Sequence, residues 1–297
     1  MKSRLVWLLL CFIWGSTWLF IKLGLADLPP LTFAGIRFVI AVSILFSIIA
    51  IRRIPLPQRR GDWVMLVITG VLAFSLNYGL LFWGEQYISS GLAALLQATI
   101  PAFGMVIAHF YLPGERMTPA RIFGVTLGVL GVALVFSNQL GMGGPQALAG
   151  SVALVLSSVC VAYANVLVKA RAIRLHPAIL ASGQMFFGLF PLLLIGIPLE
   201  GNPVNFRWTA VAVLSLFYLA IVGSVVAFLL YYWLMQNMDV TKTMLIALVT
   251  PVVAVVLGMV VLNEQLSWRT LVGGALIMSG IALVVLRRRK SKTVTAG

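Results

Sequence analysis

Polar and aromatic side chains that interrupt long apolar runs are the residues of this sequence that could do chemistry. They are amides, phenols, indoles and one guanidinium, which suit the noncovalent binding of a small organic solute. A polar group in an apolar run is costly unless it is paired, so each forms either an interhelical hydrogen bond or part of a shared site. The candidate binding residues are Trp14, Trp18, Arg37, Asn77, Gln97, Tyr163, Asn165, Gln184 and Tyr231.

Two basic residues inside apolar runs, Lys22 and Arg37, leave three interpretations open. Their long side chains can extend to a membrane surface, form an ion pair with Asp27 or Glu85, or bind a carboxylate or other anion of a solute. Arg37 is the better anion candidate, because its planar guanidinium can hold a carboxylate through two parallel hydrogen bonds.

The acidic residues all lie in loops or at the predicted ends of helices. A proton-coupled exporter of cationic drugs usually needs a carboxylate buried inside the membrane, so this mode is disfavoured. Glu85 and His109 remain the candidates for proton coupling, although His109 is better placed for a hydrogen bond near a membrane surface. The seven acidic residues are Asp27, Asp62, Glu85, Glu115, Glu200, Asp239 and Glu264.

Catalytic, cofactor and metal motifs are missing from the sequence. His109 and His176 are the only histidines and belong to no HExxH or GxSxG motif. Cys11 and Cys160 both fall inside apolar runs, so neither a disulfide framework nor a CxxC site is available. We therefore expect no catalytic residue, no cofactor and no bound metal, and an integral-membrane enzyme acting on lipids is a remote alternative.

The composition shows which elements must position these residues. Of 297 residues, 61% are hydrophobic and only 9% are charged, with a mean hydropathy of +1.07. The apolar residues occur in continuous runs of about 20, as expected for helices that cross a membrane and unlike the alternating strands of a barrel. We expect ten transmembrane helices, at about 5–25, 31–51, 63–83, 88–111, 122–137, 147–168, 177–199, 208–235, 243–262 and 270–286.

The net charge of +14 is explained by position, without a nucleic-acid partner. Seventeen of the 21 basic residues fall in the loops and termini of one side, and two fall on the other side. This asymmetry predicts that both termini are cytoplasmic and that the protein lies in the cytoplasmic membrane, with the lipid bilayer as its surroundings. The basic tail at 287–297 then touches anionic lipid.

The chain also repeats itself. Residues 83–105 align with 233–255 at an offset of 150, which pairs Pro101 with Pro251, and Lys22 aligns with Lys169 at an offset of 147. We therefore divide the chain into two five-helix repeats, 1–138 and 147–286. Five is odd, so the second repeat enters the membrane inverted, an arrangement typical of transporters. The two prolines form either packing kinks or hinges beside a substrate path.

These elements together resemble the drug/metabolite transporter superfamily in its ten-helix EamA-like branch. The resemblance covers both halves, but the second half departs from the pattern where Gln184 replaces Arg37. The motifs of the first half are Trp14-Gly15-Ser16, Lys22, Leu28-Pro29-Pro30, Arg37, Ala93 to Pro101, Gly114-Glu115, and the glycines Gly124, Gly128 and Gly131.

The resemblance implies a basket of helices around a central cavity, alternating access, and export or facilitated movement of small metabolites such as amino acids. The main alternative is a proton antiporter of multidrug or cationic compounds. The partner is therefore a small-molecule substrate. Small-x-x-x-small motifs, such as Gly124-x-x-x-Gly128, leave a monomer and a homodimer both open.

Overall fold

The computed structural model describes residues 2–113, 115, 117–138, 144–172, 175–237 and 246–287, and these residues form helices without any strand. Eight helical stretches are long and apolar enough to cross a membrane, and two shorter apolar helices follow them. All ten agree with the expected ranges to within a few residues. Residues 243–245 of the ninth expected range and 288–297 of the basic tail lie outside the described residues.

The first half contains five of these stretches. In chain order they consist of α1 (Lys2–Leu25), α2 (Pro30–Ile51), α3 (Arg60–Gly70) continuing into α4 (Asn77–Glu85), α5 (Ser90–Gln97) followed by α6 (Ile100–Tyr111), and α7 (Pro119–Asn138).

The second half contains the other five. They consist of α8 (Gly144–Leu167), α9 (Pro177–Glu200), α10 (Ala210–Phe217) continuing into α11 (Ala227–Asn237), α13 (Ile246–Val261) and α14 (Trp268–Arg287).

The helices begin where the sequence supplies acceptors for free backbone N–H groups. The Oγ of Ser89 accepts a hydrogen bond from the N–H of Leu92 at the start of α5, and the Oγ1 of Thr209 accepts one from Ala212 at the start of α10. Helix α2 is capped from further away, because the Glu200 carboxylate at the end of α9 accepts from the N–H groups of Leu31 and Thr32.

Irregular turns occur at equivalent places in the two halves. The stretch from α3 to α4 contains a π-helical segment, Val71–Leu76, and the stretch from α10 to α11 contains another, Tyr218–Val226. The repeat offset of 150 places the first segment inside the second. Segments of this kind are frequent at functional sites. The helical pattern of the sequence gave no indication of them.

The two prolines identified from the repeat act differently on their helices. Pro101 is the second residue of α6 and follows a break between α5 and α6, whereas Pro251 lies inside α13 without ending it. The first proline therefore begins a new helix within its apolar stretch, and the second is accommodated within one.

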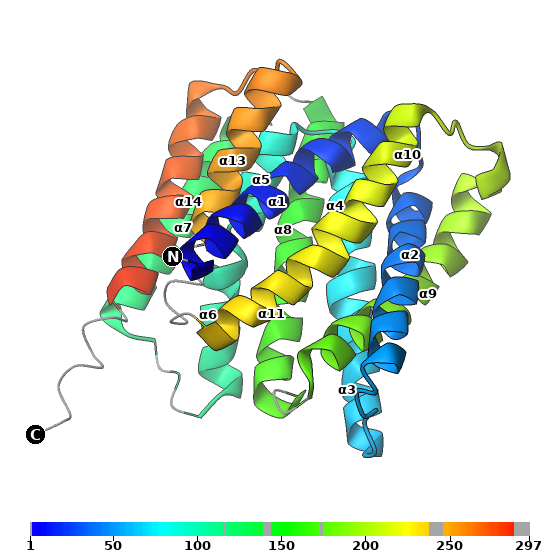
Figure 1. Ribbon diagram of the computed structural model, residues 1–297. Helices are drawn as coiled ribbons and strands as arrows, with labels where there is room; N and C mark the ends of the chain where they lie inside the picture. Colours follow the sequence, from blue (N-terminus) through cyan, green and yellow to red (C-terminus); the bar gives the residue numbers. More distant parts are fainter. Residues whose placement is uncertain are drawn as a thin grey trace, which may run out of the picture.

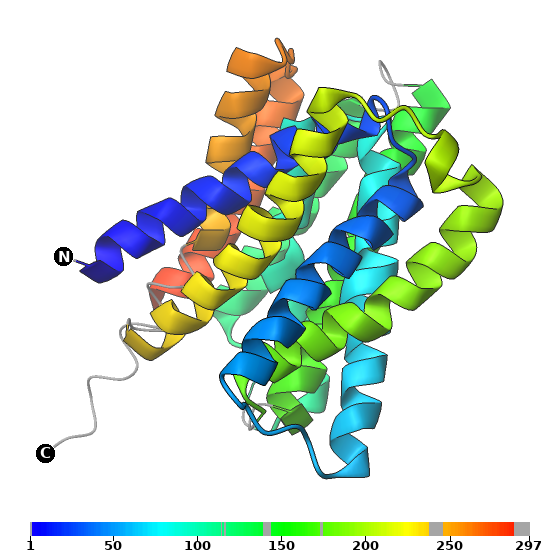
Figure 2. The same cartoon turned by 45° about the vertical axis from the view of Figure 1, so that its right-hand side comes forward.

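Helices of the first half pack mainly on helices of the second half, as Figures 1 and 2 show. Helix α2 packs on α9 and α7 packs on α14, and each of these pairs joins equivalent helices of the repeat. Helix α4 packs on α8, and its second-half equivalent, α11, packs on α1. The interior of the bundle is therefore built from both halves.

Glycines allow the closest of these contacts, between α7 and α14. A side chain on Gly131 would place its Cβ 2.5 Å from the carbonyl oxygen of Gly273, and one on Gly273 would lie 2.7 Å from the oxygen of Gly131. Gly280 faces Gly124 in the same way. Small residues let helix backbones approach within a membrane, so the glycine motif of α7 serves packing within one chain.

Gly131→Leu should therefore separate α7 from α14 and lower the free energy of unfolding by about 2 kcal/mol, a typical cost of overpacking. The measurement is the midpoint of thermal unfolding in detergent. Gly104→Ala is the control, because no atom lies within 4 Å of the added Cβ. Equal midpoints for the two variants would contradict the assignment.

Candidate functional site

A chain of aromatic rings connects the two halves in the interior of the bundle. The ring of Trp14 on α1 lies 5.3 Å from that of Tyr231 and 6.0 Å from that of Phe228, both on α11. Phe228 in turn lies 6.2 Å from Phe74, and Phe74 is stacked at 5.7 Å on Tyr78 of α4. The predicted pair Trp14 and Tyr231 is therefore brought together, through helices of different halves.

Arg37 lies at the far end of this aromatic chain. Its guanidinium is 5.1 Å from the ring centroid of Tyr78, and only 2% of the residue is exposed. The Nε atom donates a hydrogen bond of 3.2 Å to the Oγ of Ser224, in the π-helical segment of the second half. The Nη1 atom has no hydrogen-bond partner, and no carboxylate among the described residues forms an ion pair with Arg37.

A second polar group centres on Gln97 of α5. Its side-chain amide donates to the Oδ1 of Asn77, at 3.3 Å, and to the Oγ of Ser157 on α8. Asn77 in turn donates to the backbone oxygen of Ala73. The predicted residues Gln97 and Asn77 therefore lie in contact, next to Tyr78 along the chain, and they join three helices.

The side chains of α6 are the least covered in this region. None of its residues is buried, and residues 101–108 are all partly exposed. A Cβ on Gly104 would meet no atom within 4 Å. By contrast, Gln97 is 7% exposed. The surface beside α6 is therefore open where Pro101 and Gly104 lie, one helical turn beyond the Gln97 group.

Other candidate residues lie apart from these two groups. Trp18 is buried on α1, and Gln184 is buried on α9, where its backbone oxygen lies 2.6 Å from the position of a Cβ on Gly70. Tyr163 forms a hydrogen bond with Tyr111 near the end of the bundle, and Asn165 is exposed.

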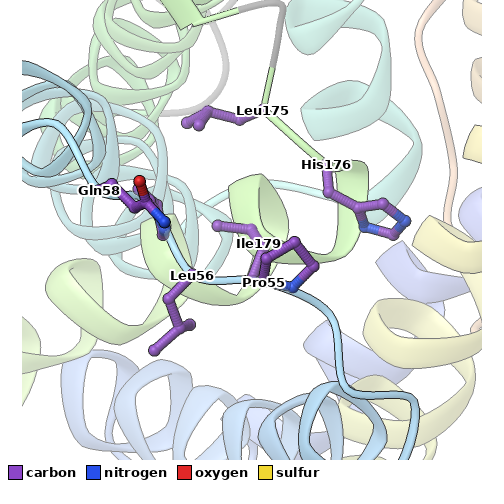
Figure 3. A pocket seen from close by; sticks show the side chains of 7 residues that line it. Pro55, Leu56, Gln58, Leu175, His176 and Ile179 are labelled. Atoms are coloured by element: carbon purple, nitrogen blue, oxygen red, sulfur yellow. The ribbon is translucent and has the colours of Figure 1, made fainter.

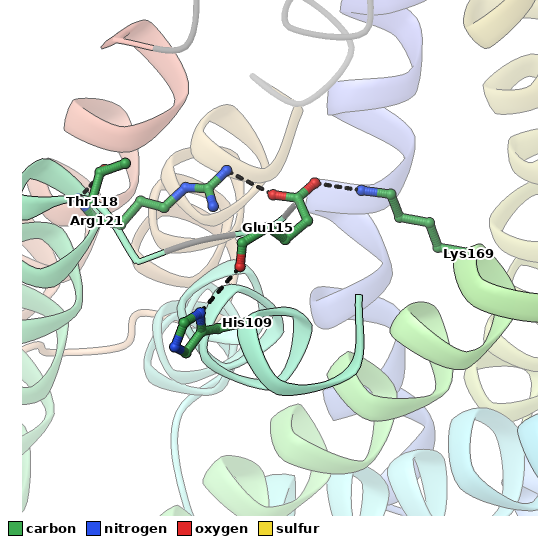
Figure 4. Close-up of polar contacts among 5 residues, drawn as sticks. All are labelled: His109, Glu115, Thr118, Arg121 and Lys169. Carbon is green, nitrogen blue, oxygen red and sulfur yellow. Dashed lines mark hydrogen bonds and ion pairs between the residues drawn. The ribbon is translucent and has the colours of Figure 1, made fainter. Parts of the chain in front are cut away.

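The two coupling candidates lie at opposite ends of the bundle. Glu85 is the last residue of α4 and is fully buried, and neither of its carboxylate oxygens has a hydrogen-bond partner. His109 lies near the end of α6, where its Nδ1 is 3.2 Å from the backbone oxygen of Glu115. Figure 4 shows this histidine beside Glu115 at the end of the bundle.

Lys22 differs from its sequence interpretation. Its ammonium group donates to the backbone oxygens of Glu85, at 2.6 Å, Gln86, at 3.2 Å, and Ile88, at 2.6 Å. The suggested ion pair with Asp27 is wrong, because Asp27 pairs with Arg207 at 3.3 Å. Lys22 instead satisfies the free carbonyl groups at the end of α4, where the helix dipole favours a cation.

A surface pocket of about 330 Å³ lies elsewhere, between the segment before α3 and the start of α9 (Figure 3). Its lining is mostly apolar and uses none of the candidate residues. The lining residues are Pro55, Leu56, Pro57, Gln58, Leu175, His176 and Ile179. His176 is occupied in capping α9, since its Nδ1 accepts from the N–H of Ala178. Within the described residues, no group of His, Cys, Asp and Glu could hold a metal ion.

Sequence reasoning missed three participants. Tyr78 lies against Arg37, Ser157 accepts from Gln97, and the hydroxyl of Tyr218 lies 2.6 Å from that of Ser16. Tyr78 follows the predicted residue Asn77 directly, and the helical spacing of Phe74, Tyr78 and Phe82 was the available signal.

Comparison with known proteins gives consistent similarities over the whole chain. The model of the EamA-like transporter family matches residues 1–137 and again 148–286. The "Uncharacterized transporter YoaV" of Bacillus subtilis is 29% identical over 91% of each chain. The "Uncharacterized inner membrane transporter YedA" of Escherichia coli is 28% identical over 93% of this chain and 88% of the relative.

Two further similarities extend nearly end to end. A protein of Escherichia coli named "Probable amino-acid metabolite efflux pump" is 25% identical and is matched over 100% of this chain and 99% of its own. A solved crystal structure superimposes with a TM-score of 0.68 and 22% identity, covering 98% of this chain and 99% of the other. This last similarity shows the fold.

Arg37→Met should keep the free energy of unfolding within about 1 kcal/mol of its original value. A buried charge without a carboxylate partner contributes little net stability, and an apolar side chain of similar length avoids its desolvation cost. Thermal unfolding in detergent measures this. The neighbouring Phe38→Ala is the control and should cost about 3 kcal/mol, because Phe38 is fully buried. A loss for Arg37→Met as large as that of the control would show a structural role instead.

Proposed function

We propose that this chain, which belongs to the EamA-like transporter family, exports small metabolites such as amino acids, or facilitates their movement, by alternating access. The coarser statement already follows from the family and from the apolar helices: the chain is a multi-pass membrane transporter. Its substrate and mechanism are the matter of the proposal. The name of the efflux pump that it resembles supports amino acids as the first class to test.

The packing between the halves is the observation that supports alternating access best. Contacts between helices recur when the two halves are exchanged: α4 lies on α8 as α11 lies on α1, and α5 and α6 lie on α8 as α13 lies on α1. We take the chain as two inverted five-helix repeats, 1–138 and 147–286, which together make ten transmembrane helices. Such a pair has a second arrangement of similar energy, in which the halves exchange conformations.

The basic residues suggest the orientation of the bundle. Lys169, Arg121 and the start of α3 at Arg60 lie at one end, and Lys22 and the α4–α5 turn at the other (Figure 1). We place the Lys169 end in the cytoplasm of the cell, with both termini on that side of the cytoplasmic membrane. The partly exposed side chains of α6 then make a route from the cytoplasm toward Gln97.

The aromatic chain and the two polar groups supply the proposed substrate contacts. Trp14 and Tyr231 offer flat apolar surfaces for a side chain, and Gln97 with Asn77 offers an amide. Arg37 offers the guanidinium that a carboxylate would bind, since its Nη1 has no other partner. Trp18, Tyr163, Asn165 and Gln184 complete the proposed lining in other conformations. Pro101 and Pro251 are the proposed hinges.

Proton antiport of cationic compounds is the second candidate function, and Glu85 is the observation in its favour. A buried carboxylate without hydrogen-bond partners is the kind of group that exchanges a proton for a cation. The position of Glu85 at the end of α4, away from the aromatic chain, makes this candidate the weaker one. The six described acidic residues all lie at helix ends or between helices.

The first experiment is counterflow with purified protein in liposomes. Labelled amino acids, their amides, nucleosides and cationic dyes are tested with and without a pH gradient. Saturable counterflow of an amino acid that does not respond to the gradient would support the facilitator. Accumulation of a dye that depends on the gradient and is lost in Glu85→Gln would support the antiporter instead. Absence of saturable counterflow for every solute would contradict both.

Arg37→Met should abolish the preference for amino acids over their amides, by about tenfold or more, since a hydrogen bond to a charged group contributes roughly 1.5–3 kcal/mol. The ratio of counterflow rates for the acid and its amide measures this preference. Arg37→Lys, which keeps the charge without the fork, is the matched control and should retain part of it. An unchanged ratio in Arg37→Met would exclude Arg37 as the carboxylate group.

Gln97→Leu should lower the rate of counterflow at least tenfold, because it removes the amide from the middle of the proposed route. Its stability should fall by only about 1 kcal/mol, the usual size of such hydrogen bonds within membranes. Ser47→Ala is the control, since Ser47 bonds only to its own helix. A full rate in Gln97→Leu would remove Gln97 from the site.

A further inference from the structure

Two charged side chains from separate elements hold the turn between α4 and α5. One is Lys22 of α1, which donates to the backbone oxygens of Glu85, Gln86 and Ile88 on the α4 side. The other is Glu264, between α13 and α14, whose carboxylate accepts from the N–H of Ser90 at 2.7 Å and of Gly91 at 3.1 Å. A cation at the end of one helix and an anion at the start of the next match both helix dipoles.

The segment around Glu264 is shaped for this contact. Asn263, directly before it, has a φ of 53°, a conformation that asparagine adopts more readily than most residues. Gly258 leaves the space that the carboxylate occupies, because a Cβ at this position would collide with the Oε2 of Glu264. Lys22 and Glu264 therefore reach the turn from opposite sides and close this end of the bundle.

The repeat supplies the same two residue types at the other end. Lys169 is the equivalent of Lys22, and Glu115 is the equivalent of Glu264. Here the two side chains bind each other: the Nζ of Lys169 lies 2.7 Å from the Oε1 of Glu115, and Arg121 binds the other carboxylate oxygen at 2.8 Å (Figure 4). Among the described residues Lys22 and Glu264 form no such ion pair. One structure therefore contains both arrangements of one pair of charges.

We propose that these arrangements are the closed and open states of two exchanging latches, a mechanism that rests on the alternating access proposed above. At the closed end, the lysine and the glutamate bind the turn between two helices. At the open end, they bind each other. When the transporter turns over, Lys22 and Glu264 leave the α4–α5 turn and pair, and the pair of Lys169 and Glu115 separates.

The exchange explains how such a change can occur at low cost. A charge left without a partner in a poorly hydrated site costs several kcal/mol, which would trap the protein in one state. In the exchange, Lys22 and Glu264 trade backbone partners for each other, so neither charge is left unpaired. Two states of comparable energy are what a transporter needs, because a substrate can then shift their populations.

The test measures the distance across the Lys22 end by electron paramagnetic resonance in liposomes, without substrate. Spin labels are placed on Val204 and Trp268, which are both exposed and take no part in the latch. Glu264→Gln weakens only the closed state at this end and should raise the fraction of long distances about tenfold. Adding Glu115→Gln, which weakens the opposing open-end pair, should reverse most of this change.

Glu200→Gln is the matched control. Its carboxylate accepts from two backbone N–H groups, at 2.8 and 2.7 Å, at the start of another helix of the same end. The equivalent position in the repeat is Arg53, so Glu200 has no exchange partner and its variant should leave the distances unchanged. A response of Glu200→Gln equal to that of Glu264→Gln would overturn the proposal, as would a double variant that shifts as far as Glu264→Gln alone.

The charge-swapped variant Lys22→Glu with Glu264→Lys separates the latch from a loss of folding. The swapped residues can still pair with each other, but a glutamate cannot donate to carbonyl groups and a lysine cannot accept from N–H groups. This variant should hold the Lys22 end open, and distances like those of the unchanged protein would overturn the proposal. Normal counterflow together with distances that ignore every latch variant would reject the latch while leaving the proposed function intact.

Discussion

The fold depends on one constraint, the cost of an unpaired backbone polar group in a medium without water. Regular helices satisfy it internally, and the irregular places here are satisfied by side chains from elsewhere. Lys22 covers the carbonyl groups at the end of α4, and Glu200 covers the N–H groups at the start of α2. The backbone oxygen of Gly188 accepts from Ser75, which belongs to a π-helical segment of the other half. Much of what joins the two halves is therefore the satisfaction of main-chain groups.

The same constraint explains how much of the fold the sequence could predict. Continuous apolar runs can only be helices in a membrane, so the ten ranges agreed with the structure to within a few residues. The π-helical segments were not predictable, because they follow from packing: Gly223 leaves room beside Thr17 and Arg37, and Ser224 bonds to the backbone of Leu219 within its own segment. Sequence periodicity contains the helix and none of these contacts.

The candidate site was predictable in its members and less so in their partners. Gln97 and Asn77 were chosen because amides are rare in apolar runs, and they are in contact. Tyr78 and Ser157 were missed because a tyrosine and a serine are ordinary residues in such runs. Lys22 was misjudged for a different reason: a search for charged partners does not consider the carbonyl groups at the end of a neighbouring helix, which here are its main partners.

Arg37 and Gln184 occupy equivalent positions in the two halves, and only one of them is charged. The voltage across a membrane acts on a buried charge with about 2.3 kcal/mol for each 100 mV that the charge traverses. It does no comparable work on an amide. Any movement of α2 along the membrane normal is therefore driven or opposed by the voltage, whereas the same movement of α9 at Gln184 is not. A bundle that is nearly symmetric in shape is thus electrically polarised, and the cell's resting potential becomes a force on its conformation.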